Sequence, residues 1–471
     1  MGHWPTLQGR MKKILRGNSS LARRIGADGV EFLEHAARAV DRLMPHLELS
    51  AWTEGARSEA RASWTSKARD AIRITLAIGP ESDTGSKSLF AIAKRRHGGK
   101  AAGYTVSLRE HDLCDFIAKR ISKVMSRVPV ESSDGISIRT LRDAFDEHVI
   151  ASHLQGLWKV RLPVGSLLRE LHKLSEQSYE NKSYSFGCIL ETDLDAAADG
   201  EDLGSFPREF LQAKRYKALS DGFRTAYVVS ANGEVADFVD LEQFERKKLT
   251  EKHFFPSWSE RIARASRAGK YGIALSRQGD ILIFEEGTLR FSYRFGRWQF
   301  WNHQFLLELL RDQARAQGVN RSQLGRVIGP IYRAALDISF RRSGGLFVIL
   351  RNRNNVRKIV RSGDGIGDDR RLSTDADFDD IFDGKTIKTL HRAIAVELAS
   401  LDGAIVIDNT GRIRAYGAVL KSGGKTTKKG SRVEGSRTQA AIAASHCGLA
   451  IKISSDGDIT VFANGSEFIS V

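Results

Sequence analysis

The chain has 471 residues, 73 of them lysine or arginine and 57 aspartate or glutamate, and 41% of its residues are hydrophobic. This length corresponds to about three domains or two large ones, each able to bury its own core, so disorder is not expected. The three widely spaced cysteines, Cys114, Cys188 and Cys447, exclude a disulfide framework and a four-cysteine zinc site. They favour a reducing compartment over an extracellular one.

Neither a secretory signal nor a membrane span is expected. The first 20 residues are basic but are followed by no apolar core, and nowhere do about 18 apolar residues follow one another. We therefore expect a soluble, cytoplasmic protein that does not bind membranes. The formal net charge of +16 favours phosphate-bearing partners, and both nucleotides and nucleic acids fit that description.

Residues 1–180 are expected to form a mainly helical N-terminal region. Apolar residues recur at helical spacing in 29–44, 111–125 and 164–178. Two runs rich in β-branched and apolar residues, 70–80 and 87–95, flank a turn-forming segment and predict a hairpin packed against helices.

Residues 181–303 are expected to form a small α+β domain. Extended runs at 183–193 and 225–241 predict strands joined by a helix, and Asn232-Gly233 is a strong hairpin signal within the second run. Three further apolar runs between 270 and 302 predict a β-meander.

A cluster of basic and aromatic residues lies at the end of this meander: Arg294, Arg297, Trp298 and Trp301. Such residues could stack on a nucleobase. We interpret them instead as strand-end residues that pack on their neighbours. Residues 304–324 then predict a helix that connects this domain to the last one.

Residues 325–471 alternate between helical and extended patterns. The pattern predicts an α/β (α+β) fold with a mixed β-sheet flanked by helices. The expected elements are a helix at 327–342, a strand at 344–352, a helix at 385–401, a hairpin at 402–420 turning at 408–411, a helix at 436–447 and a hairpin at 449–463.

Two motifs in this region indicate chemistry. Asp402-Gly403-Ala404 places a carboxylate before two residues with almost no side chain, which lets a ligand approach the backbone. Gly435-Ser436-Arg437 precedes an alanine-rich helix, where free N–H groups, the helix dipole, a hydroxyl and a guanidinium all favour phosphate. Each motif alone is equally typical of a plain turn or an N-cap.

Residues from about 325 to 471 resemble a diadenylate cyclase domain, the ATP-condensing module of a bacterial DNA-integrity scanning protein. Residues 331–350 resemble the first helix and strand of the family, and LDGAIVI (401–407) matches its Asp-Gly-Ala motif. GSRTQAAIAAS (435–445) aligns with its Gly-Thr-Arg-His-Arg-Ala-Ala motif. RSGDGIG (361–367), which contains Gly363 and Gly365, falls where the family has a nucleotide-pocket segment.

The resemblance implies a bacterial nucleotidyltransferase that condenses two ATP into the second messenger cyclic di-AMP with Mg²⁺ or Mn²⁺. Two protomers must face each other, which implies at least a transient homo-dimer. Asp402 would hold the metal and orient the ribose 3′-hydroxyl, while Gly403 and Ala404 admit the nucleotide. Ser436, Arg437, Thr438 and Gln439 would bind the nucleotide, with Ser436 and Arg437 on the polyphosphate.

The chain departs from the family at Arg437-Thr438-Gln439, where the family has Arg-His-Arg. Loss of a phosphate-binding cation, at about 1.5–3 kcal/mol per charge-assisted bond, lowers transition-state binding by about one to two decades. The lysine-rich loop 421–432 offers one way to replace the lost positive charge. The plainer interpretation is that this loop is simply solvated.

Two functions therefore stay open for the chain. The first is an active cyclase, and the second is a degenerate cyclase domain that only binds nucleotide. Residues 1–303 resemble regulatory regions fused to some bacterial diadenylate cyclases, which implies a sensor whose signal is a nucleic acid, a protein or another ligand.

Overall fold

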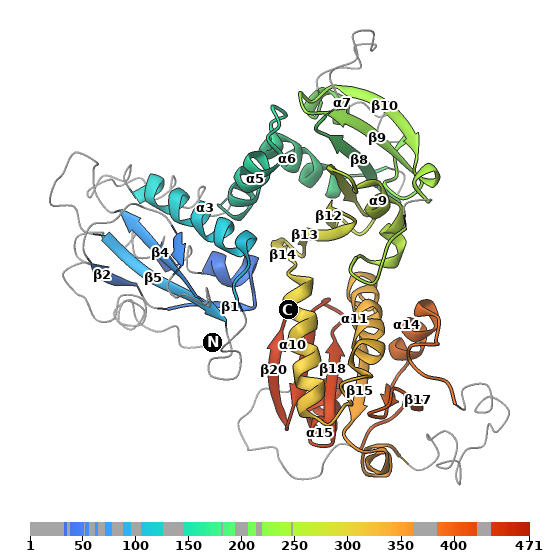
Figure 1. Cartoon of the computed structure of the whole chain (residues 1–471). Coiled ribbons are helices and arrows are strands. Elements are labelled where there is room, and N and C mark those ends of the chain that lie inside the picture. Colours follow the sequence, from blue (N-terminus) through green and yellow to red (C-terminus); the bar gives the residue numbers. More distant parts are fainter. Residues whose placement is uncertain are drawn as a thin grey trace. The chain divides into compact units, whose positions relative to one another are not determined.

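The computed structural model divides into two compact units (Figure 1), the first comprising Met1–Lys248 and Arg261–Trp301 and the second Leu249–Glu260 and Asn302–Val471. Helices and sheets are mixed in both units, as predicted. The structure describes residues 33–34, 38–50, 52–55, 62–64, 71–77, 88–95, 105–125, 145–179, 182–193, 206–212, 219–245, 248–361, 384–421 and 435–471.

An antiparallel five-stranded sheet opens the first unit, in the order β1-β5-β4-β3 with β2 also paired to β5. The predicted hairpin is confirmed as β4 and β5. The other three strands were not predicted, because a strand of three residues is too short to display an alternating pattern. The strands are β1 (Leu47–Leu49), β2 (Thr53–Gly55), β3 (Ala62–Trp64), β4 (Ala71–Ala77) and β5 (Ser88–Arg95).

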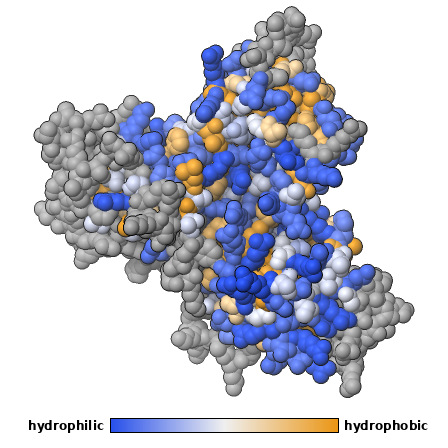
Figure 2. All heavy atoms as spheres, in the orientation of Figure 1, coloured by the Kyte–Doolittle hydropathy of each residue, from blue (hydrophilic) through white to orange (hydrophobic). Residues whose placement is uncertain are grey.

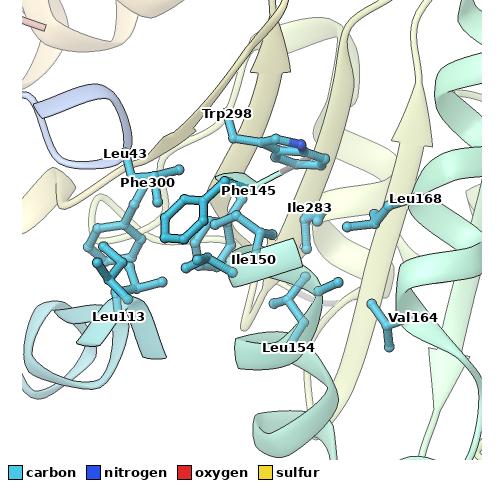
Figure 3. Close-up of a cluster of buried hydrophobic side chains, with 14 of the residues drawn as sticks. Leu43, Leu113, Phe145, Ile150, Leu154, Val164, Leu168, Ile283, Trp298 and Phe300 are labelled. Carbon is cyan, nitrogen blue, oxygen red and sulfur yellow. The ribbon is translucent and has the colours of Figure 1, made fainter. Parts of the chain in front are cut away.

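The described helices that follow are α3 (Leu108–Met125), α5 (Phe145–Trp158) and α6 (Val164–Ser175). The first and third confirm the helices predicted at 111–125 and 164–178. Of the helix predicted at 29–44, the described residues 33–34 and 38–43 are helical. Figure 3 shows Phe145 and Ile150 of α5 in one apolar cluster with Trp298 and Phe300 of the meander, so the helices and the following sheet share a core.

A seven-stranded sheet completes the first unit, in the order β10-β9-β8-β11-β12-β13-β14, with only β8 and β9 parallel among its pairs. It confirms the predicted helix-joined strands, the hairpin at Asn232-Gly233 and the meander. Its elements are β8 (Phe186–Glu191), α7 (Arg208–Gln212), β9 (Thr225–Ser230), β10 (Val235–Asp240), α9 (Glu260–Ala265), β11 (Lys270–Leu275), β12 (Ile281–Glu285), β13 (Thr288–Arg294) and β14 (Arg297–Phe300). A two-stranded ribbon, β6 (Ser178–Tyr179) and β7 (Lys182–Ser183), precedes it.

The tryptophans at the end of the meander are buried. Trp298 packs against Tyr293 with ring centroids 5.4 Å apart, and the Trp301 indole N–H donates to the Ser292 hydroxyl at 2.9 Å. Both indoles are at most 2% exposed. The interpretation as strand-end packing is therefore confirmed, and these rings are not available to stack on a base.

The second unit contains a six-stranded mixed sheet in the order β17-β16-β15-β18-β19-β20, in which only β15 and β16 are parallel. The strands are β15 (Gly345–Leu350), β16 (Ala404–Ile407), β17 (Ile413–Ala418), β18 (Gly448–Ile453), β19 (Ile459–Ala463) and β20 (Ser466–Ser470). The helices are α10 (His303–Ala316), α11 (Leu324–Arg341), α12 (Val356–Ile359), α14 (Arg392–Ser400) and α15 (Ser436–Ser445).

The predicted helix at 385–401 was too long, because α14 begins only at Arg392. The residues before it pair with the turn of the β16–β17 hairpin: Thr386 forms a bridge with Arg412, and the Ile387 N–H donates to the Gly411 carbonyl at 2.9 Å. Backbone pairing with this turn thus replaces the first helical turns. The other helices, strands and hairpins predicted from 327 onward are confirmed.

Hydrophilic residues cover most of the visible face of the second unit (Figure 2). Across the part of the chain that the structure describes, no helix combines the length and the apolar character needed to cross a membrane.

Candidate functional site

The two predicted motifs lie at one end of the central strands of the six-stranded sheet. The parallel strands β15 and β16 both begin at this end of the sheet, and the antiparallel β18 ends there, since Gly345 pairs with Ile453. Asp402 comes two residues before the start of β16, and Arg437 lies in the first turn of α15. Their side chains meet, with Arg437 Nη2 3.8 Å from Asp402 Oδ1.

Asp402 is fully exposed, whereas about one third of the Arg437 side chain is exposed. An ion pair of this kind contributes little to stability because water screens it. Its charges are therefore open to a ligand.

The two small residues after Asp402 are required by packing. Gly403 has a φ of +149°, and a Cβ atom there would lie 2.3 Å from the carbonyl carbon of Gly417 on β17. Ala404 is fully buried beneath α15, in a core that includes Ala441 and Ala444. Their predicted role in admitting a nucleotide stays a prediction beside this packing role.

A glycine that the sequence argument did not single out positions Arg437. Gly344, with a φ of +70°, lies against the guanidinium, and a Cβ at this position would be 2.5 Å from Arg437 Nη1. The signal available in the sequence was the pair Gly344-Gly345 directly before a buried strand. A side chain at residue 344 would displace the guanidinium.

The start of α15 is an uncapped helix N-terminus. Gly435 is its N-cap residue, and no side chain caps it. Gly435 accepts from the N–H of Thr438 at 2.9 Å, while Ser436 and Gln439 are exposed. The partial positive charge of a helix N-terminus favours an anion here.

The structure adds a lysine to this site. Lys452 on β18 donates to the hydroxyl of Thr438 at 3.1 Å and is half-buried. The sequence signal was a single charged residue inside the apolar strand LAIKI (449–453).

Several predicted residues lie outside the described residues: Gly363, Gly365 and the lysines of the 421–432 loop beyond Lys421. Lys421 itself is described, and its ammonium donates to the Arg357 carbonyl at 2.7 Å.

Within the described ranges, Asp402 is the carboxylate at the site, and no cluster of three or more side chains suited to a metal occurs there. Mg²⁺ is commonly held by one or two carboxylates together with substrate phosphates and waters. One carboxylate is compatible with a divalent cation that arrives with a nucleotide, and Asp402 is the residue that would hold it.

An ion pair with a buried carboxylate supports the helix that leads into Asp402. Asp337 on α11 is 1% exposed, and it accepts from Arg392 Nη2 at 2.7 Å and from the Ser257 N–H at 2.6 Å. Arg392, the first residue of α14, also donates to the Phe255 carbonyl at 2.8 Å. Because α14 ends at Ser400, this network fixes the helix just before the Asp402 turn.

Residues 332–467 match the family described as DisA bacterial checkpoint controller nucleotide-binding, and the C-terminal domain of this chain is a domain of that family. It is a diadenylate cyclase-like nucleotide-binding domain. None of the curated proteins compared matches the chain.

Solved structures similar to the chain include a double mutant of DacA from Staphylococcus aureus, at 19% identity over 30% of this chain and 84% of that one, with a TM-score of 0.22. A hypothetical membrane spanning protein from Bacillus cereus is similar at 17% identity over 36% of this chain and 78% of that one, with a TM-score of 0.24.

Proposed function

We propose that the C-terminal domain binds ATP and condenses two ATP molecules into cyclic di-AMP. The observation that carries this proposal is the meeting of Asp402 and Arg437 at an uncapped helix N-terminus within a domain of a nucleotide-binding family. A carboxylate beside a phosphate-binding cation is the arrangement that ribose and polyphosphate recognition requires.

Each charged group has a separate task in the reaction. The guanidinium of Arg437 and the N–H groups at the start of α15 bind the polyphosphate, and Asp402 accepts a hydrogen bond from the ribose 3′-hydroxyl. Each 3′-oxygen then bonds to the α-phosphorus of the other nucleotide as the bond to pyrophosphate breaks, and the hydroxyl proton passes to the Asp402 carboxylate and from there to water. Mg²⁺ or Mn²⁺ bound with the triphosphate would neutralise phosphate charge.

The reaction requires two protomers, because each domain holds one ATP and each hydroxyl attacks the other nucleotide. The complete exposure of Asp402 leaves its carboxylate accessible to a second protomer. We therefore include a homo-dimer with facing sites, formed at least transiently, in the proposal.

Nucleotide binding without condensation is the second candidate function. Thr438 and Gln439 favour it, because neither side chain carries the charge that the resemblance implies at these positions. In this case the domain reports on nucleotide concentration, and residues 1–303 sense a further signal or bind nucleic acid.

Incubation of the full chain with each nucleoside triphosphate and Mg²⁺ or Mn²⁺ tests the proposal. Mass spectrometry identifies the products, and calorimetry measures nucleotide affinity in the same samples. Cyclic di-AMP formed from ATP supports the cyclase. ATP binding without a product supports the second candidate, and the absence of ATP binding overturns both.

A further inference from the structure

We propose that Lys452 is a phosphate-binding residue of the nucleotide site, supplying positive charge from β18 to the first turn of α15. This inference rests on the proposed function, since it assigns a residue to the same site. It concerns binding of the triphosphate and is independent of whether condensation follows.

The strand register directs Lys452 toward α15. Lys452 pairs with Leu346 on β15 and Thr460 on β19. Side chains alternate between the faces of a sheet, so Lys452 shares a face with Ala450. Ala450 and Leu346 belong to the core that packs under α15. Lys452 is thus the charged residue of an otherwise apolar strand face, placed under the start of this helix.

The same register relates Lys452 to the Asp402 motif. Phe347 pairs with Ile405, which places Leu346 beside Ala404. Ala404, Leu346 and Lys452 therefore form a row across three adjacent strands, and neighbouring strands lie about 4.8 Å apart. Two strand spacings separate the backbone of Lys452 from that of Ala404 by about 10 Å, and Asp402 lies two residues before Ala404 at the same end of the sheet.

Among the residues that the structure describes, the ammonium of Lys452 has no counter-charge beside it. Among the described residues no carboxylate lies within 4.0 Å of it, and its one hydrogen-bond partner is the neutral hydroxyl of Thr438. An ammonium has three N–H donors, and a half-buried charge that uses one of them on a neutral partner is poorly compensated.

The helix dipole increases this imbalance. Cations are unfavourable near a helix N-terminus, yet both Arg437 and Lys452 lie there. An anion bound between them would relieve the repulsion and complete the hydrogen bonding of both groups. A polyphosphate has the charge and the number of acceptors for this task, and lysine binds phosphate as a point charge.

The position of Lys452 also accounts for a departure from the family motif. Its ammonium contacts Thr438, where the resemblance implies a histidine. We infer that the strand provides a positive charge that the helix itself no longer carries. The described part of the lysine-rich loop does not do so, because Lys421 is engaged at the Arg357 carbonyl.

The test compares the affinities of the full chain for ATP and adenosine with Mg²⁺ present, by calorimetry. Lys452→Met should weaken ATP binding about ten-fold or more, which corresponds to one charge-assisted bond, and should leave adenosine affinity unchanged. Lys452→Arg should keep ATP affinity within about three-fold of wild type. The control Lys388→Met removes the same charge from an exposed lysine near the β16–β17 turn, at the opposite end of β16 from Asp402, and should change neither affinity.

A second variant addresses folding. Should Lys452→Met lose its native circular dichroism, Lys452→Gln takes its place, because glutamine can still bond Thr438 but carries no charge. Wild-type ATP affinity in the folded neutral variant overturns the assignment of Lys452 and leaves the proposed function standing. An equal loss for ATP and adenosine also overturns it, since a structural defect does not distinguish phosphates. Failure of the wild-type chain to bind ATP overturns the proposed function itself.

Discussion

Gly403→Ala tests whether packing holds the Asp402 turn in place. The substitution adds one methyl group at a residue whose φ is +149°, a conformation that residues other than glycine rarely adopt. The new Cβ would lie 2.3 Å from the Gly417 carbonyl carbon, 2.4 Å from its oxygen and 2.7 Å from the Ala418 nitrogen. All three are backbone atoms of β17, so no side-chain rotation relieves the contact.

The cost follows from these contacts. Overpacking costs about 1–3 kcal/mol and a residue forced into a sparsely populated backbone region about 1–3 kcal/mol, which together give about 2–6 kcal/mol. For a unit of about 180 residues, each kcal/mol lowers the Tm by about 2–4 °C. We expect the unfolding transition of the second unit to fall by about 5–20 °C, and ATP affinity to fall with it as the Asp402 turn moves.

Differential scanning calorimetry measures the change, and Gly325→Ala is the matched control. Gly325 lies in the first turn of α11, where an added Cβ meets no atom within 4 Å. Alanine favours a helix over glycine by about 1 kcal/mol, so the control should leave the Tm unchanged or raise it slightly. A Gly403→Ala protein that melts within about 2 °C of wild type would refute the packing argument.

Three further predictions concern single charged groups. Asp402→Asn should abolish any cyclic di-AMP formation in the mass-spectrometric assay and leave the Tm unchanged, because the carboxylate is fully exposed; turnover within a few-fold of wild type would make Asp402 a plain turn residue. Asp337→Asn removes the buried carboxylate that pairs with the partly buried Arg392 and should cost about 2–3 kcal/mol in denaturant unfolding. A loss under 1 kcal/mol would contradict a supporting role. Burial, with a smaller contribution from Arg109, lowers the pKa of His153 from 6.5 to about 4. As the pH falls from 6.5 to 4, the histidine binds its proton in the unfolded chain before it does so in the folded one. The free energy of unfolding of the first unit should therefore fall by about 3 kcal/mol over this range. Melting curves at several pH values should show this fall for the wild type and not for His153→Phe.

The sequence predicted the second unit well because its elements are long and their patterns are distinct. The strand 345–350 and the hairpins turning at 408–411 and 456–457 have apolar runs bounded by turn residues, and each forms as predicted. The start of α14 was misplaced because tertiary pairing with Gly411 and Arg412, far along the chain, competes with local helical preference. The three-residue strands of the first sheet escaped prediction since their partners, and not their own pattern, define them.

The candidate site was predictable where a motif is continuous in sequence. Asp402 and Arg437 each belong to such a motif, and their contact follows from strand order. Lys452 could not be placed in the same way, because its approach to Thr438 depends on the register between β18 and β15 and on the packing of α15. Gly344 was missed for a related reason, since its role is to accommodate a side chain that is distant in sequence.

Different residues of the site carry different amounts of information about function. Gly403 and Ala404 are demanded by contacts with β17 and α15, so a protein that had lost catalysis but kept this fold would still need them. Among the described residues, no packing contact requires the charges of Asp402, Arg437 or Lys452, and two of these charges oppose the dipole of α15. Arg437 and Lys452 place two positive charges at a helix N-terminus beside one exposed carboxylate, and a bound polyphosphate would offset this excess of positive charge. Substitutions of Asp402, Arg437 and Lys452, and not of the small residues beside Asp402, can therefore distinguish a nucleotide-binding domain from one that has kept only the fold.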